Sequence, residues 1–276
     1  MSGDITDGAL VIRCGQRGRM TIEVRVTGRS CHGSIPREGL NPLEYGAAIL
    51  AEAAARHERG EGFGHDERLG PGSRTATWAT VETASDCSVP ERFTFRFDRR
   101  LTAGESPDDA LRAVAGLDSV AHAIAAGLTV EIAVPRYEEA TWRGYAPGNP
   151  RVYGAWRTPE DHPAVAAAVA TYREVVGPHV DEPHERGGSL RREPRLGYWR
   201  FSTDGVGWPS PVDEPALVVP AGKRWVTAGN MRHPAIFGLG PGLMQNAHKI
   251  GEAVDLRELR HAIAFLARYP SRFAAS

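Results

Sequence analysis

The sequence predicts an α/β protein in two parts: an α+β domain of the ferredoxin-like type, followed by part of an α/β layered domain. Between residues 15 and 135, segments with the periodicity of strands and segments with the periodicity of helices alternate in the order β-α-β-β-α-β. After residue 135 the chain becomes rich in proline, glycine and aromatic residues, and helices and strand-to-loop junctions replace most complete strands. These two observations define the predicted fold class.

The first predicted strand covers residues 19–28, RMTIEVRVTG, in which apolar and polar side chains alternate. Asn41 followed by Pro42 is typical of an N-cap and the first residue of a helix, so a helix is predicted from Pro42 to about Arg59. Residues 60–74 are rich in glycine and charge, which predicts a loop.

Two strands, a helix and a last strand complete the first part. The strands are predicted at residues 75–83, TATWATVET, and at residues 92–100, RFTFRFDRR. A helix is predicted to begin after the N-cap Ser106 and to run to about Ala126. Residues 127–135, GLTVEIAVP, form the fourth strand. This order predicts a four-stranded antiparallel sheet with both helices on one face, a fold that hosts many functions and identifies none.

The second part contains two predicted helices, at residues 162–177 and 254–270. The apolar stripe of the closing helix is predicted to consist of Leu256, Leu259, Ile263 and Leu266. Residues 178–200 are polar and predicted to be irregular, whereas residues 201–208 and 235–242 are predicted to be strand-to-loop junctions. Helices and junctions with few complete strands are typical of one half of an α/β layered domain. The domain at 15–135 is therefore predicted to be inserted into this second domain.

Composition excludes several classes of protein. The 276 residues are 41% hydrophobic and 24% charged, as in globular proteins, and the net charge of −1 predicts no affinity for nucleic acid or acidic membranes. No apolar run is long enough to span a membrane, and the N-terminus does not resemble a signal peptide. Cys14, Cys31 and Cys87 have no metal-binding spacing, which argues against a disulfide framework and predicts a cytoplasmic location.

The loop GRSCHGSIPREGLN at residues 28–41 places His32 just after a strand. This histidine could donate to an oxyanion or bind a metal, or it could be a loop histidine bonded to the local backbone. Its neighbour Cys31 is not expected to form an activated pair with it, because adjacent residues of an extended chain point to opposite sides. Arg99 and Arg100 end the phenylalanine-rich strand, where they could hold a substrate carboxylate or form strand-edge salt bridges.

The segment FGLGPGLMQNAHKIGEAV at residues 237–254 contains His248 and Glu252 after a glycine-rich strand end. Histidine is a common zinc ligand, and a nearby carboxylate often orients it. A flavin or nucleotide site on the glycines is only weakly indicated, because the P-loop lysine and the full G-x-G-x-x-G are absent. Asp4 and Asp204 lie in glycine-flanked turns, where an Asx turn is the alternative to a role as a ligand.

Four stretches together resemble one family, the co-catalytic zinc amidohydrolases and exopeptidases typified by acetylornithine deacetylase, succinyl-diaminopimelate desuccinylase and carboxypeptidase G. They are GQRGRMTIEVRVTGRSCHGSIPREGLNP, SVPERFTFRFDRRLTAGES, FSTDGV and FGLGPGLMQNAHKIGEAV. The resemblance covers nearly the whole chain in the same order. The segments DRRLTAGES and TPEDHP are most similar to the branch described as selenium-metabolism-linked hydrolases.

The resemblance implies a domain organisation and a reaction. Residues 1–14 would be a remnant of the catalytic domain, residues 15–135 a ferredoxin-like lid that also makes a homodimer, and residues 136–276 the C-terminal part of an α/β zinc-hydrolase catalytic domain. The implied reaction is metal-dependent hydrolysis of an amide or peptide bond. The implied substrate is a small acylated amino acid or dipeptide-like molecule that carries a carboxylate.

The resemblance also implies roles for individual residues. His32 would reach into the partner subunit's site and stabilise the tetrahedral oxyanion, while Arg100 and Asn41 would bind substrate, Arg100 through the carboxylate. His248 would be the last zinc ligand, with Glu252 orienting it. Asp4 falls where the family usually has a glutamate ligand. The complete family enzyme holds two zinc ions, which cobalt or manganese could replace.

Other family features are missing from this sequence. The family carries an H-x-D, a bridging aspartate and a Glu-Glu pair in its first half, and the first glutamate of that pair is the general base. No H-x-D lies on a predicted strand here, and the pair Glu138–Glu139 falls outside the matching order. The chain is therefore expected to be an incomplete hydrolase with at most two zinc ligands. The alternative is a non-catalytic dimerisation or small-molecule binding module derived from such an enzyme.

Overall fold

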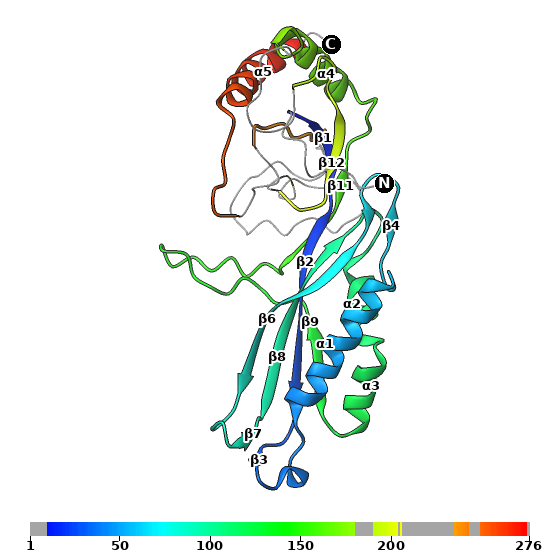
Figure 1. Ribbon diagram of the computed structural model, residues 1–276, viewed down its shortest axis with the longest axis vertical. Coiled ribbons are helices and arrows are strands. Elements are labelled where there is room, and N and C mark those ends of the chain that lie inside the picture. The colour runs from blue at the N-terminus through cyan, green and yellow to red at the C-terminus, as the bar shows by residue number, and fades with distance from the viewer. Residues whose placement is uncertain (1–9, 180–189, 204, 206–234, 243–248, 275–276) are drawn as a thin grey trace. The chain divides into compact units, whose positions relative to one another are not determined.

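The computed structural model describes residues 10–179, 190–203, 205, 235–242 and 249–274, and Figure 1 shows its helices and strands. The chain divides into two compact units. The first consists of Arg17–Trp156 and Arg200–Gly207, and the second of Met1–Gln16, Arg157–Trp199 and Trp208–Ser276. No helix within the described parts of the chain is long and apolar enough to cross a membrane.

The unit that begins at Arg17 is built on a five-stranded antiparallel sheet. Its strands are β2 (Gly18–Thr27), β6 (Ser73–Glu82), β8 (Arg92–Leu101), β9 (Thr129–Ala133) and β10 (Val152–Tyr153). Strand β8 lies between β2 and β6, while β9 and β10 pair with the other side of β2. The order β9-β2-β8-β6 is that of the ferredoxin-like fold, so the predicted fold of this part is confirmed. The predicted number of four strands is wrong, because the short strand β10 adds a fifth.

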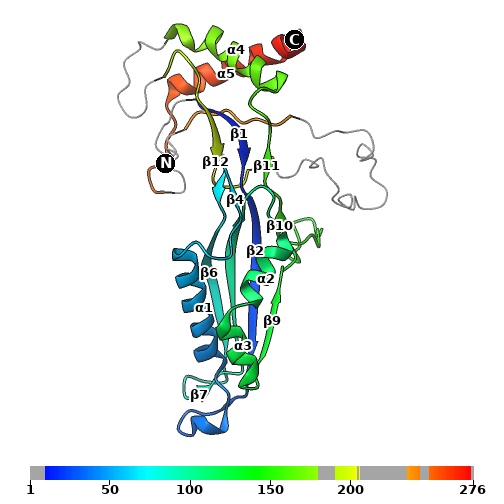
Figure 2. The same cartoon turned by 90° about the vertical axis from the view of Figure 1, so that its right-hand side faces the viewer.

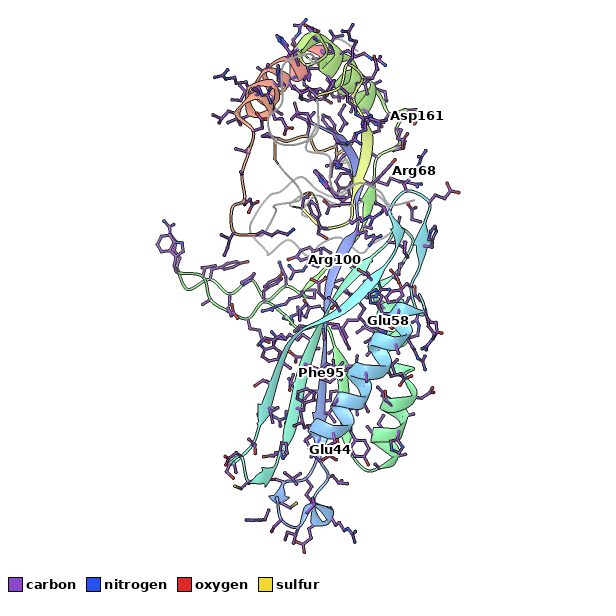
Figure 3. The ribbon with its side chains drawn as sticks, viewed as in Figure 1. Glu44, Glu58, Arg68, Phe95, Arg100 and Asp161 are labelled. Atoms are coloured by element: carbon purple, nitrogen blue, oxygen red, sulfur yellow. The ribbon has the colours of Figure 1, made fainter. Side chains whose placement is uncertain are left out.

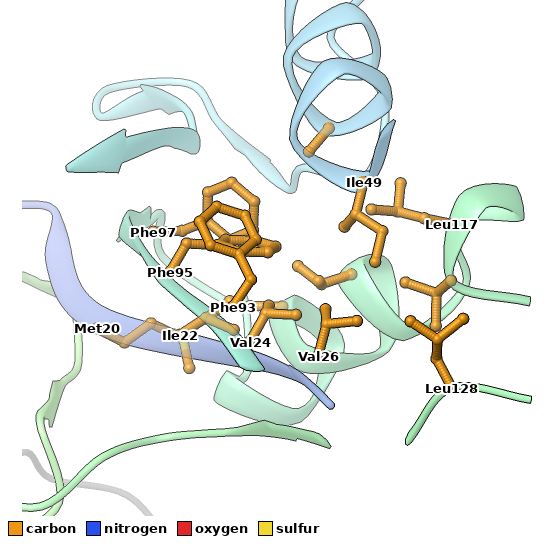
Figure 4. Packing of buried hydrophobic residues seen from close by; sticks show 14 of the residues in the cluster. Met20, Ile22, Val24, Val26, Ile49, Phe93, Phe95, Phe97, Leu117 and Leu128 are labelled. Atoms are coloured by element: carbon orange, nitrogen blue, oxygen red, sulfur yellow. The ribbon is translucent and has the colours of Figure 1, made fainter. Parts of the chain in front are cut away.

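Three helices cover one face of this sheet, as Figure 2 shows: α1 (Pro42–Glu58), α2 (Pro107–Ala115) and α3 (Asp118–Ala125). The core between them is drawn in Figure 4 and includes Met20, Ile22, Val24, Val26, Ile49, Phe93, Phe95, Phe97, Leu117 and Leu128. Helix α1 approaches the sheet closely at Gly46, where a Cβ atom would lie 2.3 Å from the Phe93 ring. The apolar residues of β2 are all fully buried in this core, so the alternation of β2 identified its buried face correctly.

The single helix predicted from Ser106 to Ala126 is wrong, because the structure divides it into α2 and α3. A carboxylate from α1 caps the start of α3: Glu52 accepts hydrogen bonds from the backbone N–H groups of Asp118 and Ser119, at 3.1 and 2.8 Å. Burial would raise the pKa of Glu52, but hydrogen bonds from Ser119, Asp118 and Arg56 outweigh it and lower that pKa to about 2. Gly116 ends α2 as its C-cap, and Glu52, a residue distant in sequence, caps the start of α3.

Short elements complete this unit. Strand β3 (Cys31–His32) pairs with β7 (Ser88–Val89), and β4 (His65–Asp66) pairs with β5 (Gly70–Pro71). The β4–β5 hairpin lies inside the segment that was predicted to be entirely loop. A one-turn helix η1 (Pro36–Glu38) follows β3.

The second unit contains a three-stranded sheet in the order β11-β1-β12, from β1 (Ile12–Gln16), β11 (Trp156–Arg157) and β12 (Leu196–Trp199). Strands β1 and β12 are parallel. The prediction that residues 178–200 are irregular is therefore wrong at β12, a strand too short to show a clear period. In the described parts of the two predicted junctions there is no strand, and Gly238 forms only an isolated bridge with Arg13.

Helices α4 (Pro163–Val175) and α5 (Leu256–Ala274) pack together in this unit, with the one-turn η2 (Gly177–His179) after α4. The predicted apolar stripe of α5 is wrong: its four residues are between 36% and 65% exposed. The buried residues are instead Glu258, Ala262 and Phe265. Helix α5 has apolar side chains on two faces, so its period alone does not decide which face is buried.

Candidate functional site

The loop that carries His32 is held by backbone hydrogen bonds. Arg29 and Leu40 exchange a pair of them, at 3.0 and 2.9 Å, which closes the base of the loop. At the tip, the Ile35 N–H donates to the His32 carbonyl at 3.0 Å. Opposite His32, across the pairing of β3 with β7, lies Ser88. The side chain of His32 is exposed, so the loop presents an imidazole to solvent.

The two neighbours in Cys31–His32 point to opposite sides, as expected. The Cys31 Sγ lies 3.5 Å from the Ile35 carbonyl oxygen, and a Cβ atom on Gly39 would come within 2.7 Å of that sulfur. The His32 Nδ1 instead accepts from the Ser34 N–H at 3.1 Å. No hydrogen bond joins the thiol to the imidazole, so a Cys–His nucleophile is not formed here.

Asn41 is the N-cap of α1. Its Oδ1 accepts from the Leu43 N–H at 3.1 Å, and its Nδ2 donates to Glu44 at 3.0 Å. Both ends of the amide are engaged in capping, and the role of Asn41 in substrate binding stays a prediction.

Arg100, which Figure 3 labels on β8, is paired with a carboxylate of its own strand. Its Nε and one terminal nitrogen donate to the two oxygens of Asp98 at 2.6 and 3.1 Å, and Arg19 contacts the same carboxylate at 3.3 Å. Arg99 is 1% exposed and forms a buried ion pair with Glu105. Arg99 is therefore a structural residue, while Arg100 faces a carboxylate that compensates part of its charge.

Arg17 is a guanidinium that the sequence analysis missed. It is only 9% exposed, its Nε donates to the Leu69 carbonyl at 2.8 Å, and no carboxylate among the described residues pairs with it. Burial, followed by the charges of Arg200, Arg100 and Arg99, lowers the pKa of Arg17. An arginine cluster with excess positive charge attracts an anion. No local pattern could single out Arg17, because its burial depends on the distant segment around Leu69.

The two predicted metal ligands, Asp4 and His248, lie outside the described residues, as does Asp204, the other candidate in a glycine-flanked turn. Glu252 is exposed in a turn in which its N–H donates to the Lys249 carbonyl at 3.1 Å. Across residues 10–179, 190–203, 205, 235–242 and 249–274, no three His, Cys, Asp or Glu side chains form a group that could hold a metal ion. These residues do not by themselves fit a zinc centre.

A second residue missed by the sequence analysis is Glu258, at the start of α5. Its side chain is fully buried, and one carboxylate oxygen accepts from the Gly242 N–H at 3.2 Å. Burial raises the pKa of Glu258 to about 7, with a further contribution from Asp255. It lies on the face of α5 that the predicted stripe left out.

Comparisons with known proteins agree with this architecture. Residues 14–117 match the family model of the M20 dimerisation domain, which is described as a peptidase dimerisation domain. The uncharacterised protein YgeY of Escherichia coli strain K12 is 32% identical over 221 residues, a match that covers 76% of this chain and 49% of YgeY. The chain therefore spans about half the length of the curated relatives it matches.

Several solved structures share the fold at low identity. A tripeptidase from Staphylococcus aureus has a TM-score of 0.55 at 13% identity, and aminopeptidase PepT from Bacillus cereus has 0.54 at 12%. Each match covers 98% of this chain and 55% of the solved one. The structure of AtUAH in complex with (S)-hydroxyglycine has a TM-score of 0.61 at 9% identity, over 97% of this chain and 50% of AtUAH.

Proposed function

This chain belongs to the M20 peptidase family through its dimerisation domain, and from this premise we propose that it is the lid and C-terminal catalytic segment of an amide-bond hydrolase. The proposed substrate is a small acylated amino acid or dipeptide-like molecule with a carboxylate. The observation that carries the proposal is the His32 loop, which is closed by backbone hydrogen bonds and presents an exposed imidazole.

In the proposed reaction, the His32 imidazole donates a hydrogen bond to the oxyanion that forms when the amide carbonyl is attacked. Donors aimed at a developing oxyanion are among the largest single contributions to catalysis, provided that they are held in place beforehand. The backbone hydrogen bonds of the loop meet this condition. The family resemblance implies that this oxyanion forms in the active site of the partner subunit.

We therefore include a homodimer in the proposal. Strand β6 is the edge of its sheet: it is ten residues long, and every residue from Thr75 to Glu82 is exposed. Trp78 is 44% and Val81 38% exposed on this edge. A long edge strand offers unpaired backbone groups and apolar side chains to a second strand, which supports pairing of β6 with its copy.

The substrate carboxylate is proposed to bind at the arginine cluster. Arg100 is the residue that the resemblance assigns, and its pairing with Asp98 leaves it partly neutralised. Arg17 supports the assignment, because it adds a charge that no described carboxylate compensates. We infer that the two guanidinium groups act together on an anionic substrate.

Zinc stays a prediction for the complete enzyme. Members of the M20 family are typically metal-dependent, but the described residues of this chain form no metal-binding group. A cytoplasmic location likewise stays a prediction from cysteine usage; Cys14, Cys31 and Cys87 are all free thiols.

The test is zinc content and amide hydrolysis of the purified chain, measured alone and mixed with the half of YgeY that this chain does not match. Release of free amine from acylated amino acids or dipeptides in either sample supports the proposal. A dimer that neither binds zinc nor hydrolyses any of them in either sample contradicts it and favours a non-catalytic binding module. The coverage of only half of YgeY is the observation that keeps this second candidate open.

A further inference from the structure

Two groups of Ser34 face one nitrogen of the His32 ring. The backbone N–H of Ser34 donates to Nδ1 at an N···N distance of 3.1 Å, and the Ser34 Oγ lies 2.8 Å from the same atom. Within the described residues, the ring has no other hydrogen bond. The imidazole is therefore anchored through Nδ1 alone, and Nε2 is left for a ligand.

The backbone amide decides where the proton of the neutral ring resides. An amide N–H can only donate, so Nδ1 must keep its lone pair and the ring proton must be on Nε2. The hydroxyl does not decide this, because an O–H group can donate to Nδ1 or accept from it. It adds a second contact that orients the ring.

The turn fixes Ser34 relative to the ring. The Ile35 N–H closes the turn on the His32 carbonyl at 3.0 Å, and the Gly33 N–H donates to the Cys87 carbonyl at 2.7 Å. Gly33 is needed for this approach, since a Cβ atom there would lie 2.6 Å from the Cys87 oxygen. The backbone of the loop, and not only a side chain, holds the Ser34 amide at Nδ1.

We propose that Ser34 is a positioning residue that holds His32 as the neutral Nε2–H tautomer with Nε2 directed away from the loop. In this form His32 is a hydrogen-bond donor. It cannot serve as a general base, because the nitrogen open to a ligand carries the proton. The benefit to catalysis rests on the proposed function, whereas the tautomer is a property of this chain alone.

The tautomer is measured by nitrogen-15 NMR of the histidine-labelled chain, in which long-range proton–nitrogen correlations report the protonated nitrogen. In spectra recorded well above the pH range in which imidazoles titrate, we expect the neutral His32 ring to be entirely in the Nε2–H form. His65, an exposed histidine whose ring forms no hydrogen bond with the described residues, is the internal reference and should show both tautomers. A mixture at His32 like that of His65, or an Nδ1–H ring, would overturn the proposal without any variant.

Two variants distinguish the effect of the Ser34 amide on the tautomer from the effect of its hydroxyl. Ser34→Pro removes the amide proton, whose acceptor in the described structure is the ring, and should bring His32 to the mixture seen at His65. Ser34→Ala keeps the amide and should keep the Nε2–H form. Ser30→Ala, which removes a hydroxyl bonded to the Val89 carbonyl in the same loop, should leave the His32 signals unchanged. A pure Nε2–H ring in a folded Ser34→Pro chain would contradict the role of the amide.

Measuring kcat distinguishes this inference about the tautomer from the proposed role of His32 in catalysis. In an active assembly, His32→Ala should lower kcat by roughly 10²–10³-fold, the effect of losing one oxyanion donor. Unchanged kcat in that variant, together with a pure Nε2–H ring in the wild type, would remove His32 from the proposed reaction and leave the tautomer assignment standing. A lowered kcat in His32→Ala, together with a mixture of tautomers in the wild type, would support the role of His32 in the reaction and refute the tautomer assignment.

Discussion

Glu258 makes the stability of the second unit depend on pH in the direction opposite to that of most carboxylates. Its side chain is fully buried, and burial raises its pKa from 4.5 to about 7. The folded state therefore binds a proton that the unfolded state releases between those two pH values. Stability is highest below pH about 4.5 and falls as pH rises through about 7.

The magnitude follows from the pKa shift. Each pKa unit corresponds to about 1.4 kcal/mol, so a rise from 4.5 to about 7 costs roughly 3 kcal/mol once Glu258 is ionised. Glu258→Gln keeps an oxygen acceptor for the Gly242 N–H and removes the titration. We expect the variant to differ from the wild type by less than about 1 kcal/mol near pH 5 and to be more stable by roughly 3 kcal/mol at pH 8.

The assay is urea unfolding at several pH values between 5 and 8, followed through the amide exchange of α5 so that the readout belongs to this unit. Glu252→Gln is the matched control, because it removes an exposed carboxylate from the same region. Parallel pH profiles for the wild type and Glu258→Gln would refute the reasoning, since Glu258 would then have an ordinary pKa in the folded chain.

Three further predictions concern stability and assembly. Glu52→Ala should destabilise the first unit by about 1–2 kcal/mol near neutral pH in chemical denaturation. This difference should disappear as pH falls from 4.5 to about 2, because the hydrogen bonds that lower the pKa of Glu52 stabilise only its charged form. Phe265→Ala should cost about 3–5 kcal/mol in thermal unfolding, whereas Leu266→Ala, on the exposed face of α5, should stay within about 0.5 kcal/mol; equal losses would contradict the orientation of the helix. Trp78→Glu should shift a dimer to a monomer in light scattering, and Trp142→Glu, which is also exposed but lies outside β6, should not.

The sequence was sufficient wherever the determining interactions are local. The alternation of β2 identified its buried face, and Asn41 and Ser106 marked helix starts, because an N-cap bonds to a backbone group two or three residues away. The order of these elements then predicted the ferredoxin-like sheet. The exposed position of His32 agrees with the family resemblance, which implied that this side chain reaches out of its loop.

Tertiary structure decided the features that depend on distant residues. Glu52 of α1 caps the start of α3, and Arg17 bonds to the carbonyl of the distant Leu69, and neither contact leaves a local pattern. Helix α5 has two apolar faces, so only its packing on α4 determines which of them is buried. At His32 the sequence supplied the imidazole. Only the folded turn, which brings the Ser34 amide to Nδ1, determines which nitrogen is left to act.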